Sequence, residues 1–409
     1  MLLSIVGDLK RWNFSELCLG FYLLFLFILR EEVFQITSII EYSTPQYIYY
    51  DWFKFAVSYL FAPILFWFIV RICLLREIKY LTLKVIVFWS LLLIVNYLKA
   101  YVIGDYFSSE LIILQSISIV AIIIVIETFR MDSLKQLWEY GVYIHLAGLW
   151  INILFNLTKI SNRFNAQNMD VGGTGLLLTI FIIYLWFVKR ERGVFKSLFF
   201  ILSIFFTGSR IGLLIIAVIV SILFASSART EKYTYKSILY VIFSITVLIV
   251  AIAGSADLLL NNEMVVRNLS TFSLDFYQDQ DESAQGRLLS LITGFEVIKQ
   301  HPFGVYNSAY SLQYVMQETG YPTFAHSTVV SLYIVWGPFA MFMYYALTKL
   351  IVRLKRNKSN YFPVIMALVV MFISTGGPMV NWKINWFQAI ICYLSYKSLI
   401  NGRTNQLPN

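Results

Sequence analysis

Arg210 lies between two long apolar segments, in the sequence Thr207-Gly208-Ser209-Arg210, where Gly208 marks a tight turn. An arginine beside apolar segments is costly to desolvate, more at the centre of a bilayer than near its surface. Its planar guanidinium can donate paired hydrogen bonds to an anion such as a phosphate group. The alternative is an interface anchor, whose stem lies along apolar surface while its charge reaches water. The tight turn favours the anion ligand.

Arg287 lies near the start of a predicted amphipathic helix, residues 285–300. Apolar residues recur there at spacings of three and four, as they do in an α-helix: Leu288, Leu291, Ile292, Phe295 and Ile298. Ser283 is the predicted N-cap, and Pro302 and Gly304 are predicted to end the helix. An anion near a helix N-terminus gains from its N–H groups and dipole, so Arg287 could share an anion with Arg210. The alternative is a solvated charge.

His326 stands directly before the apolar segment 327–347. Histidine accepts a proton near neutral pH, so His326 is a candidate general base. The alternative is a histidine at the membrane surface with satisfied hydrogen bonds. His145, inside an apolar segment, and His301, in a Gln-His-Pro turn, are predicted to be structural. Because the chain has only 3 histidines, we expect no multi-histidine metal centre.

Weaker candidates lie in the polar segments on either side. Arg163 and Lys159 could supply a third cationic contact, and Arg267 is a further candidate for binding an anionic substrate. Asp281 and Glu282 could bind a sugar hydroxyl or act as an alternative base, although solvated loop charges explain them better. These residues are therefore secondary to Arg210, Arg287 and His326.

Composition predicts the elements that must position these residues. The chain has 409 residues, of which 59% are hydrophobic and 13% charged, whereas soluble domains average about 25% charged residues. A membrane-spanning helix needs about 20 mainly apolar residues, and we find about twelve candidate segments. They are residues 14–29, 52–70, 85–97, 111–126, 137–157, 172–188, 194–207, 211–224, 238–254, 327–347, 362–375 and 382–399. The sequence thus predicts an all-α polytopic membrane bundle in a single integral membrane domain, with eleven spans as the alternative count.

The one long polar stretch, residues 256–325, falls between the ninth and tenth predicted spans. Most loops are short, so a stretch of this length indicates the site where chemistry takes place. Placing the N-terminus inside puts roughly two thirds of the 32 Lys and Arg residues in inner segments, as the positive-inside rule requires. Both termini are therefore predicted to be cytoplasmic and the long stretch to face outward. The net charge of +9 follows from this bias, and no nucleic-acid partner is predicted.

Aromatic residues are frequent near the predicted outer side: Tyr47, Tyr49, Tyr50, Trp52, Tyr306, Tyr310, Tyr314 and Tyr321. Such side chains can stack on sugars, and Tyr306 is our candidate among them for substrate binding. The ordinary belt of Tyr and Trp at membrane surfaces explains most of the others. The 3 cysteines lie in or beside apolar segments and suggest neither a disulfide pair nor a metal site.

Four short motifs in this order resemble the superfamily of O-antigen ligases and O-antigen polymerases. They are Thr207-Gly208-Ser209-Arg210-Ile211-Gly212, Gly286-Arg287, His301-Pro302-Phe303-Gly304-Val305-Tyr306, and His326-Ser327 followed by Gly337. The resemblance covers about residues 163–347. This chain departs from the family pattern at Ile211, Phe303 and Tyr306, where Gly, Leu and Gly are common, and at Ala340, where ligases carry Gly, Thr or Val. These departures weaken the assignment as a ligase more than they weaken the resemblance to the superfamily.

The resemblance implies a metal-independent glycosyltransferase that uses a glycan on undecaprenyl pyrophosphate at the outer face of the bacterial cytoplasmic membrane. By this analogy Arg210 and Arg287 would hold the pyrophosphate leaving group, and His326 would activate the acceptor hydroxyl. Two arginines can stabilise the developing negative charge without a metal, and no cofactor is implied.

Within this class we favour a polymerase of oligosaccharide repeat units for an O antigen or capsule. Its expected partners are a chain-length regulator and a flippase. The alternatives are a ligase that moves finished polysaccharide to a terminal acceptor, a flippase of lipid-linked glycans, and a non-catalytic member of an export complex. A transporter should show related halves or charged helices near the middle of the membrane, and the sequence shows neither.

Overall fold

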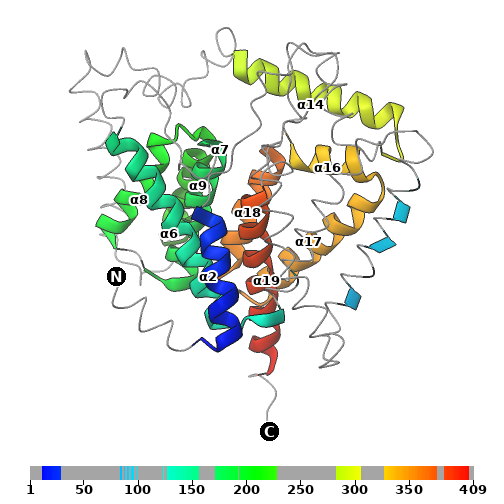
Figure 1. Cartoon of the computed structure of the whole chain (residues 1–409). Coiled ribbons are helices and arrows are strands. Elements are labelled where there is room, and N and C mark those ends of the chain that lie inside the picture. Colours follow the sequence, from blue (N-terminus) through cyan, green and yellow to red (C-terminus); the bar gives the residue numbers. More distant parts are fainter. Residues whose placement is uncertain are drawn as a thin grey trace, which may run out of the picture. The chain divides into compact units, whose positions relative to one another are not determined.

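The computed structural model describes residues 12–28, 127–155, 171–191, 193–227, 282–304, 327–374 and 382–404, together with residue 123 and single positions between 83 and 98. Within these ranges the regular elements are all helices, which confirms the predicted all-α class (Figure 1). Long apolar segments favour helices because a helix satisfies its backbone hydrogen bonds internally.

The helices lie close to the predicted segments. In chain order they are α2 (Phe14–Ile28), α6 (Met131–Phe155), α7 (Val171–Tyr184), the π-helical η4 (Leu185–Lys189), α8 (Val194–Phe206), α9 (Arg210–Ser227), α14 (Glu282–Gln300), α16 (Thr328–Trp336), α17 (Phe339–Arg356), α18 (Phe362–Ser374) and α19 (Trp382–Thr404). In the part of the chain that the structure describes, no helix is both long and apolar enough to cross a membrane. The predicted arrangement of twelve spans therefore stays a prediction.

The chain divides into two compact units. Unit 1 comprises residues 1–141, 286–350 and 375–409. Unit 2 comprises residues 142–285 and 351–374. The single integral membrane domain expected from composition stays a prediction. Of the polar stretch 256–325, only residues 282–304 belong to the described ranges.

In unit 2, α7 is the central helix and packs against α8, α9 and α18. Its residues are apolar or small on every side, which is typical of a helix surrounded by other helices. Phe181 is fully buried there, with its ring centroid 5.3 Å from that of Tyr143 and 5.2 Å from that of Phe200. The apolar character of α7 thus fixes it as the scaffold on which α8 and α9 rest.

The connection from α7 to α8 is short and held by charges. The chain leaves η4 through Arg190, which has a φ of 59°, and Glu191 then forms ion pairs with Lys189 and Lys196. The hydrogen bond from Lys196 keeps the pKa of the Glu191 carboxyl below its ordinary value, although partial desolvation opposes this. The Trp186 indole also donates to the Ser197 hydroxyl at 2.8 Å. These contacts fix the start of α8 beside the end of η4.

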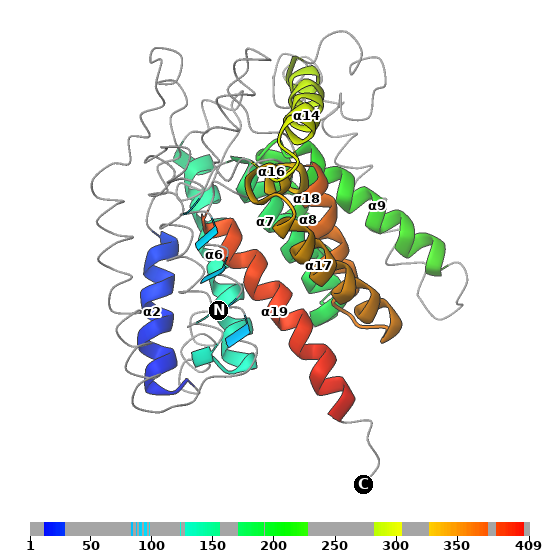
Figure 2. The same cartoon turned by 90° about the vertical axis from the view of Figure 1, so that its right-hand side faces the viewer.

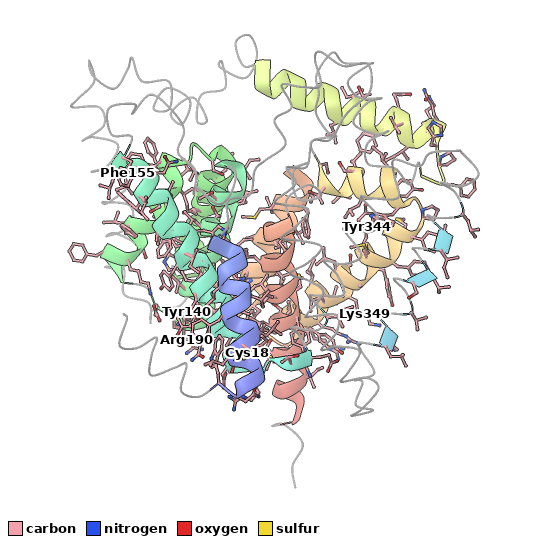
Figure 3. All side chains as sticks on the ribbon, viewed as in Figure 1. Cys18, Tyr140, Phe155, Arg190, Tyr344 and Lys349 are labelled. Carbon is pink, nitrogen blue, oxygen red and sulfur yellow. The ribbon has the colours of Figure 1, made fainter. Side chains whose placement is uncertain are left out.

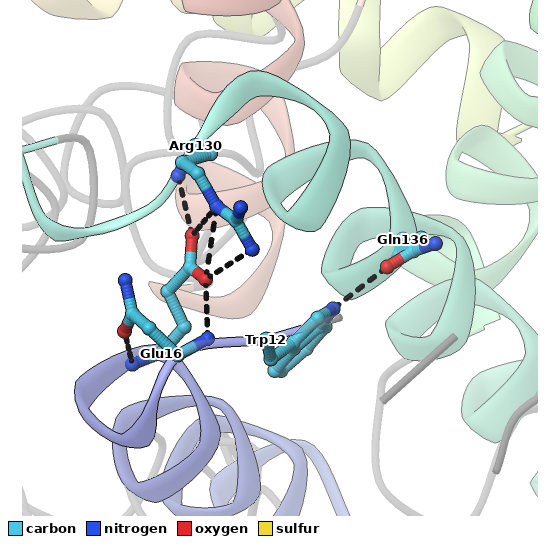
Figure 4. A network of polar contacts seen from close by, with 5 residues as sticks. Trp12, Glu16, Arg130 and Gln136 are labelled. Carbon is cyan, nitrogen blue, oxygen red and sulfur yellow. Dashed lines mark hydrogen bonds and ion pairs between the residues drawn. The ribbon is translucent and has the colours of Figure 1, made fainter. Parts of the chain in front are cut away.

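In unit 1, Glu16 joins the start of α2 to the start of α6 (Figure 4). It forms a reciprocal capping box with Asn13, at 2.8 and 2.9 Å between backbone nitrogens and side-chain oxygens. Its carboxylate also accepts hydrogen bonds from the backbone and guanidinium of Arg130, at 2.7 and 3.1 Å. Glu16 is fully buried, and these donors compensate for the lost solvation of its charge. The Trp12 indole adds a hydrogen bond to Gln136 at 2.7 Å.

The first part of α6 also packs against α19 in unit 1 (Figure 2). The buried indole of Trp138 donates to the carbonyl of Phe387 at 3.2 Å. Ile390, Ile391 and Leu394 are fully buried on α19. This contact ties the C-terminal helix to the same helix that Glu16 holds.

The predicted span 327–347 is wrong as one continuous helix, because the structure divides it into α16 and α17. Gly337 ends α16 with a φ of 55° and a ψ of −138°, and Pro338 has no N–H with which to continue the helix. The Tyr344 hydroxyl donates to the carbonyl of Val329 in α16, so the two helices stay in contact. Figure 3 labels Tyr344 and, further along α17, Lys349. The Lys349 ammonium lies 5.4 Å from the centre of the Tyr345 ring.

Candidate functional site

The turn between α8 and α9 carries the first of the sequence motifs. Thr207 ends α8, and its hydroxyl donates to the carbonyl of Ile204 at 2.6 Å. Gly208 has a φ of 61°, a conformation that glycine adopts without strain, and its N–H donates to Phe205 at 2.9 Å. The predicted tight turn is therefore present, and it ends one helix and begins the next within three residues.

Arg210 is the first residue of α9, and Ser209 is the N-cap of that helix. The Ser209 hydroxyl accepts a hydrogen bond from the backbone N–H of Gly212 at 3.3 Å, as an N-cap serine does. The other N–H groups of a first helical turn have no partner within the helix, and together with the helix dipole they attract anions. A motif residue with an anion-binding side chain thus begins a helix whose N-terminus itself favours negative charge.

A layer of small residues holds this turn against α7. A Cβ atom added at Gly175 would come within 2.6 Å of the Thr207 hydroxyl, and one added at Gly212 within 2.5 Å of the Thr179 hydroxyl. Small residues at a helix crossing allow backbones to approach closely. Sequence reasoning missed Gly175 and Thr179, although their spacing of four in an apolar helix is a recognisable sign of close packing.

The second motif lies on α14, which begins three residues earlier than predicted. Ser283 is inside this helix, so the predicted N-cap is wrong. Arg287 consequently lies in the second turn of α14, away from the free N–H groups of the first turn. The expected gain from the helix N-terminus therefore does not apply to Arg287, and its role as an anion ligand rests on its charge alone.

The packed face of α14 differs from the predicted apolar face. Val297 is fully buried against Val330 and Ile334 of α16, with Leu291 and Ile298 at the edge of this cluster. By contrast, two members of the predicted face are exposed: Ile292 by 51% and Phe295 by 56%. The 3.6-residue period predicted the helix correctly, but the partner α16 determines which side is buried.

The third motif forms the turn that ends α14. The N–H of His301 donates to Val297 at 2.8 Å, and the N–H of Gly304 donates to His301 at 2.9 Å. The carbonyl of Pro302 accepts a hydrogen bond from the Tyr333 hydroxyl on α16 at 3.0 Å. A Cβ atom added at Gly304 would lie 2.5 Å from the backbone nitrogen of Gly337. Pro302 and Gly304 thus end the helix as predicted, and the turn rests directly on the end of α16.

The remaining predicted site residues lie outside the described part of the chain: His326, Arg163, Arg267 and Tyr306. Arg210 belongs to unit 2 and Arg287 to unit 1, so their convergence with His326 stays a prediction. The described chain resumes at Ser327, directly after His326, and α16 begins at Thr328. Among the described residues, no three His, Cys, Asp or Glu side chains gather in a way that could hold a metal ion.

Comparison with known proteins gives a match to a protein family. Residues 195–345 match the family model described as O-antigen ligase. The matched segment begins with α8 and ends within α17, so it contains all four motifs and both described turns. No curated protein and no solved structure matches the chain. The match confirms the resemblance predicted from the motifs.

Proposed function

Because residues 195–345 match the O-antigen ligase family model, we propose that the chain is a polymerase of undecaprenyl-pyrophosphate-linked oligosaccharide repeat units. Proteins of this family are bacterial inner-membrane proteins that act on lipid-linked glycans. The proposed reaction takes place at the outer face of the cytoplasmic membrane, with about twelve spans and both termini inside. Its product is an O antigen or capsular polysaccharide.

In the proposed reaction, an acceptor sugar hydroxyl attacks the anomeric carbon of the donor glycan. The new glycosidic bond forms as the bond between the anomeric carbon and the phosphate oxygen breaks. The hydroxyl proton goes to His326, and undecaprenyl pyrophosphate leaves with its negative charge increased. Arg210 and Arg287 stabilise that charge, while Arg163, Arg267 and Tyr306 bind the rest of the substrate.

One observation of the structure carries most weight for this proposal: Arg210 begins a capped helix. The Ser209 cap leaves the α9 N-terminus well formed, and its N–H groups and dipole add to the guanidinium charge. A diphosphate gains from both features at once, whereas a solvated or interfacial arginine needs neither. This favours anion binding over the alternative of an interface anchor.

The second candidate function is that of a ligase, which transfers finished polysaccharide to a terminal acceptor. The description of the matched family favours it. The departures from the ligase pattern, of which Ala340 is the clearest, favour the polymerase instead. Both candidates share the donor and the proposed roles of Arg210 and His326.

The test uses the purified full-length protein with lipid-linked repeat units. A polymerase converts them into a ladder of longer lipid-linked products, whereas a flippase leaves them unextended. A ligase transfers them only when its terminal acceptor is supplied, and it forms no ladder of longer lipid-linked products. We expect Arg210→Lys to lower the rate about tenfold or more, because lysine keeps the charge but loses the paired hydrogen bonds. His326→Ala should abolish the product. A wild-type ladder from both variants would contradict the proposal.

A further inference from the structure

The contact between the turn after α14 and the end of α16 has an unusual composition. Gly304 and Gly337 meet backbone to backbone, and a Cβ atom at Gly337 would overlap the carbonyl group of Phe303. Gly337 also has a backbone conformation that residues with a Cβ atom rarely adopt. Neither position therefore admits a larger residue without moving the chain. Because the interior of a protein is close-packed, a Cβ atom at either glycine would have to push the two backbone segments apart.

This contact also sets the direction of the two helices. The C-terminal ends of α14 and α16 lie together, and Val297 packs against Val330 and Ile334 upstream of them. The two helices therefore run in the same direction from paired ends, with α14 lying over α16 (Figures 1 and 2). The Tyr333 hydrogen bond to Pro302 reinforces the same junction.

Because the paired ends fix the register, the start of the shorter α16 lies beside the middle of the longer α14. From that level, the Arg287 turn lies further toward the N-terminus of α14. At a rise of 1.5 Å per residue, the separation along the helix is about 6–12 Å, or roughly one to two helical turns. Thr328, the first residue of α16, stands two positions after His326 in the sequence. Arg287 thus lies on one of two helices that share one anchor, and the other helix begins two residues after His326 in the sequence.

We infer that Gly304 and Gly337 are positioning residues, whose backbone contact fixes the register of α14 and α16 and so the distance between the helical turn of Arg287 and the start of α16. This inference rests on the proposed function. It assigns no contact with substrate to either glycine. It explains why two motifs that are far apart in the sequence each contain a glycine at this point: the glycines are two sides of one contact.

The test measures kcat and KM of the full-length protein for its native lipid-linked repeat unit, extracted from cells that lack the polymerase activity. Gly337→Ala should lower kcat about tenfold or more, because small displacements of catalytic groups have large effects on rate. KM should rise by a smaller factor than kcat falls, because the charge that Arg287 would stabilise develops mainly in the transition state. Gly304→Ala should behave alike, and the double variant should lose little more than Gly337→Ala, because both changes break the same contact.

The control is Gly193→Ala, since a Cβ atom there meets nothing closer than 4.0 Å, and its kcat should equal that of the wild type. Tyr333→Phe serves if the glycine variants fail to fold. It removes only the hydrogen bond to Pro302 and should lower kcat about threefold at constant KM.

An unchanged kcat in Tyr333→Phe and in the folded glycine variants would overturn the inference. It would also be overturned if a rise in KM accounted for the whole loss of kcat/KM. If either of these outcomes occurs while His326→Ala loses its product, the proposed function stays intact and only the positioning role of the glycines is rejected. Retention of product in His326→Ala would instead contradict the proposed function.

Discussion

Two helix junctions carry the described motifs, and they are built in different ways. At the junction of α7, α8 and α9 in unit 2, glycines face side-chain hydroxyls of Thr179, Thr207 and Ser209. At the junction of α14, α16 and α17 in unit 1, Gly304 and Gly337 face backbone atoms. A hydroxyl-bearing side chain can change rotamer or be shortened by mutation, whereas a backbone atom moves only with its chain. The first junction should therefore tolerate change better than the second.

The same contrast appears at the two helix N-termini that follow the motifs. Ser209 accepts a hydrogen bond from the backbone of α9, but Ser327, the N-cap of α16, makes no side-chain capping bond. The start of α9 is thus stabilised locally, within the turn that carries Arg210. The position of α16 depends instead on its far end, where Gly337 meets Gly304. The start of α9 is consequently held by a capping hydrogen bond within its own turn, whereas the start of α16 is held by the glycine contact at the opposite end of the helix.

The largest expected difference concerns the glycines themselves. Gly337→Ala should destabilise the protein by about 3 kcal/mol or more, because it combines a strained backbone with an overlap against backbone atoms. Gly212→Ala should cost about 1–3 kcal/mol, because its nearest neighbour is the hydroxyl of Thr179. The measurement is the thermal unfolding midpoint of each purified variant in the same detergent. Equal shifts of the midpoint in the two variants would contradict the predicted difference between the two junctions.

A rescue experiment sharpens the account of the α7 junction. Thr179→Ala removes the hydroxyl that a Cβ atom at position 212 would approach to 2.5 Å. That hydroxyl donates only to the carbonyl of Gly175 in its own helix, so its loss alone should cost about 1 kcal/mol or less. The double variant Gly212→Ala/Thr179→Ala should be destabilised by about 1 kcal/mol less than the sum of the single variants. Strict additivity in the thermal midpoints would show that the two positions do not share a contact.

The smallest effect concerns the two serine caps. Ser209→Ala should destabilise the protein by about 1 kcal/mol, because a backbone N–H of α9 loses its partner. Ser327→Ala is the matched control and should stay within about 0.5 kcal/mol of the wild type, because no cap bond is lost. Both midpoints can be compared in one thermal unfolding series. A larger loss at Ser327 than at Ser209 would reverse the proposed contrast.

Much of the local structure could be predicted from the sequence because it depends on neighbouring residues. Unbroken apolar segments predicted α2, α8 and α18 to within one residue at each end. Gly208 predicted the turn before Arg210, and Pro302 with Gly304 predicted the end of α14. The break between α16 and α17 was missed, although Gly337-Pro338 is a local signal, because hydropathy stays high on both sides of it.

What the sequence by itself determined is the all-α class, the turn chemistry and the family resemblance, because periodicity, glycine and proline act over a few residues. Only the tertiary structure decided that Val297 rather than Ile292 is buried, that Gly175 and Thr179 support the α9 turn, and that Gly304 meets Gly337. These outcomes depend on the surface of a second helix that is distant in the chain. No pattern within one segment contains that information.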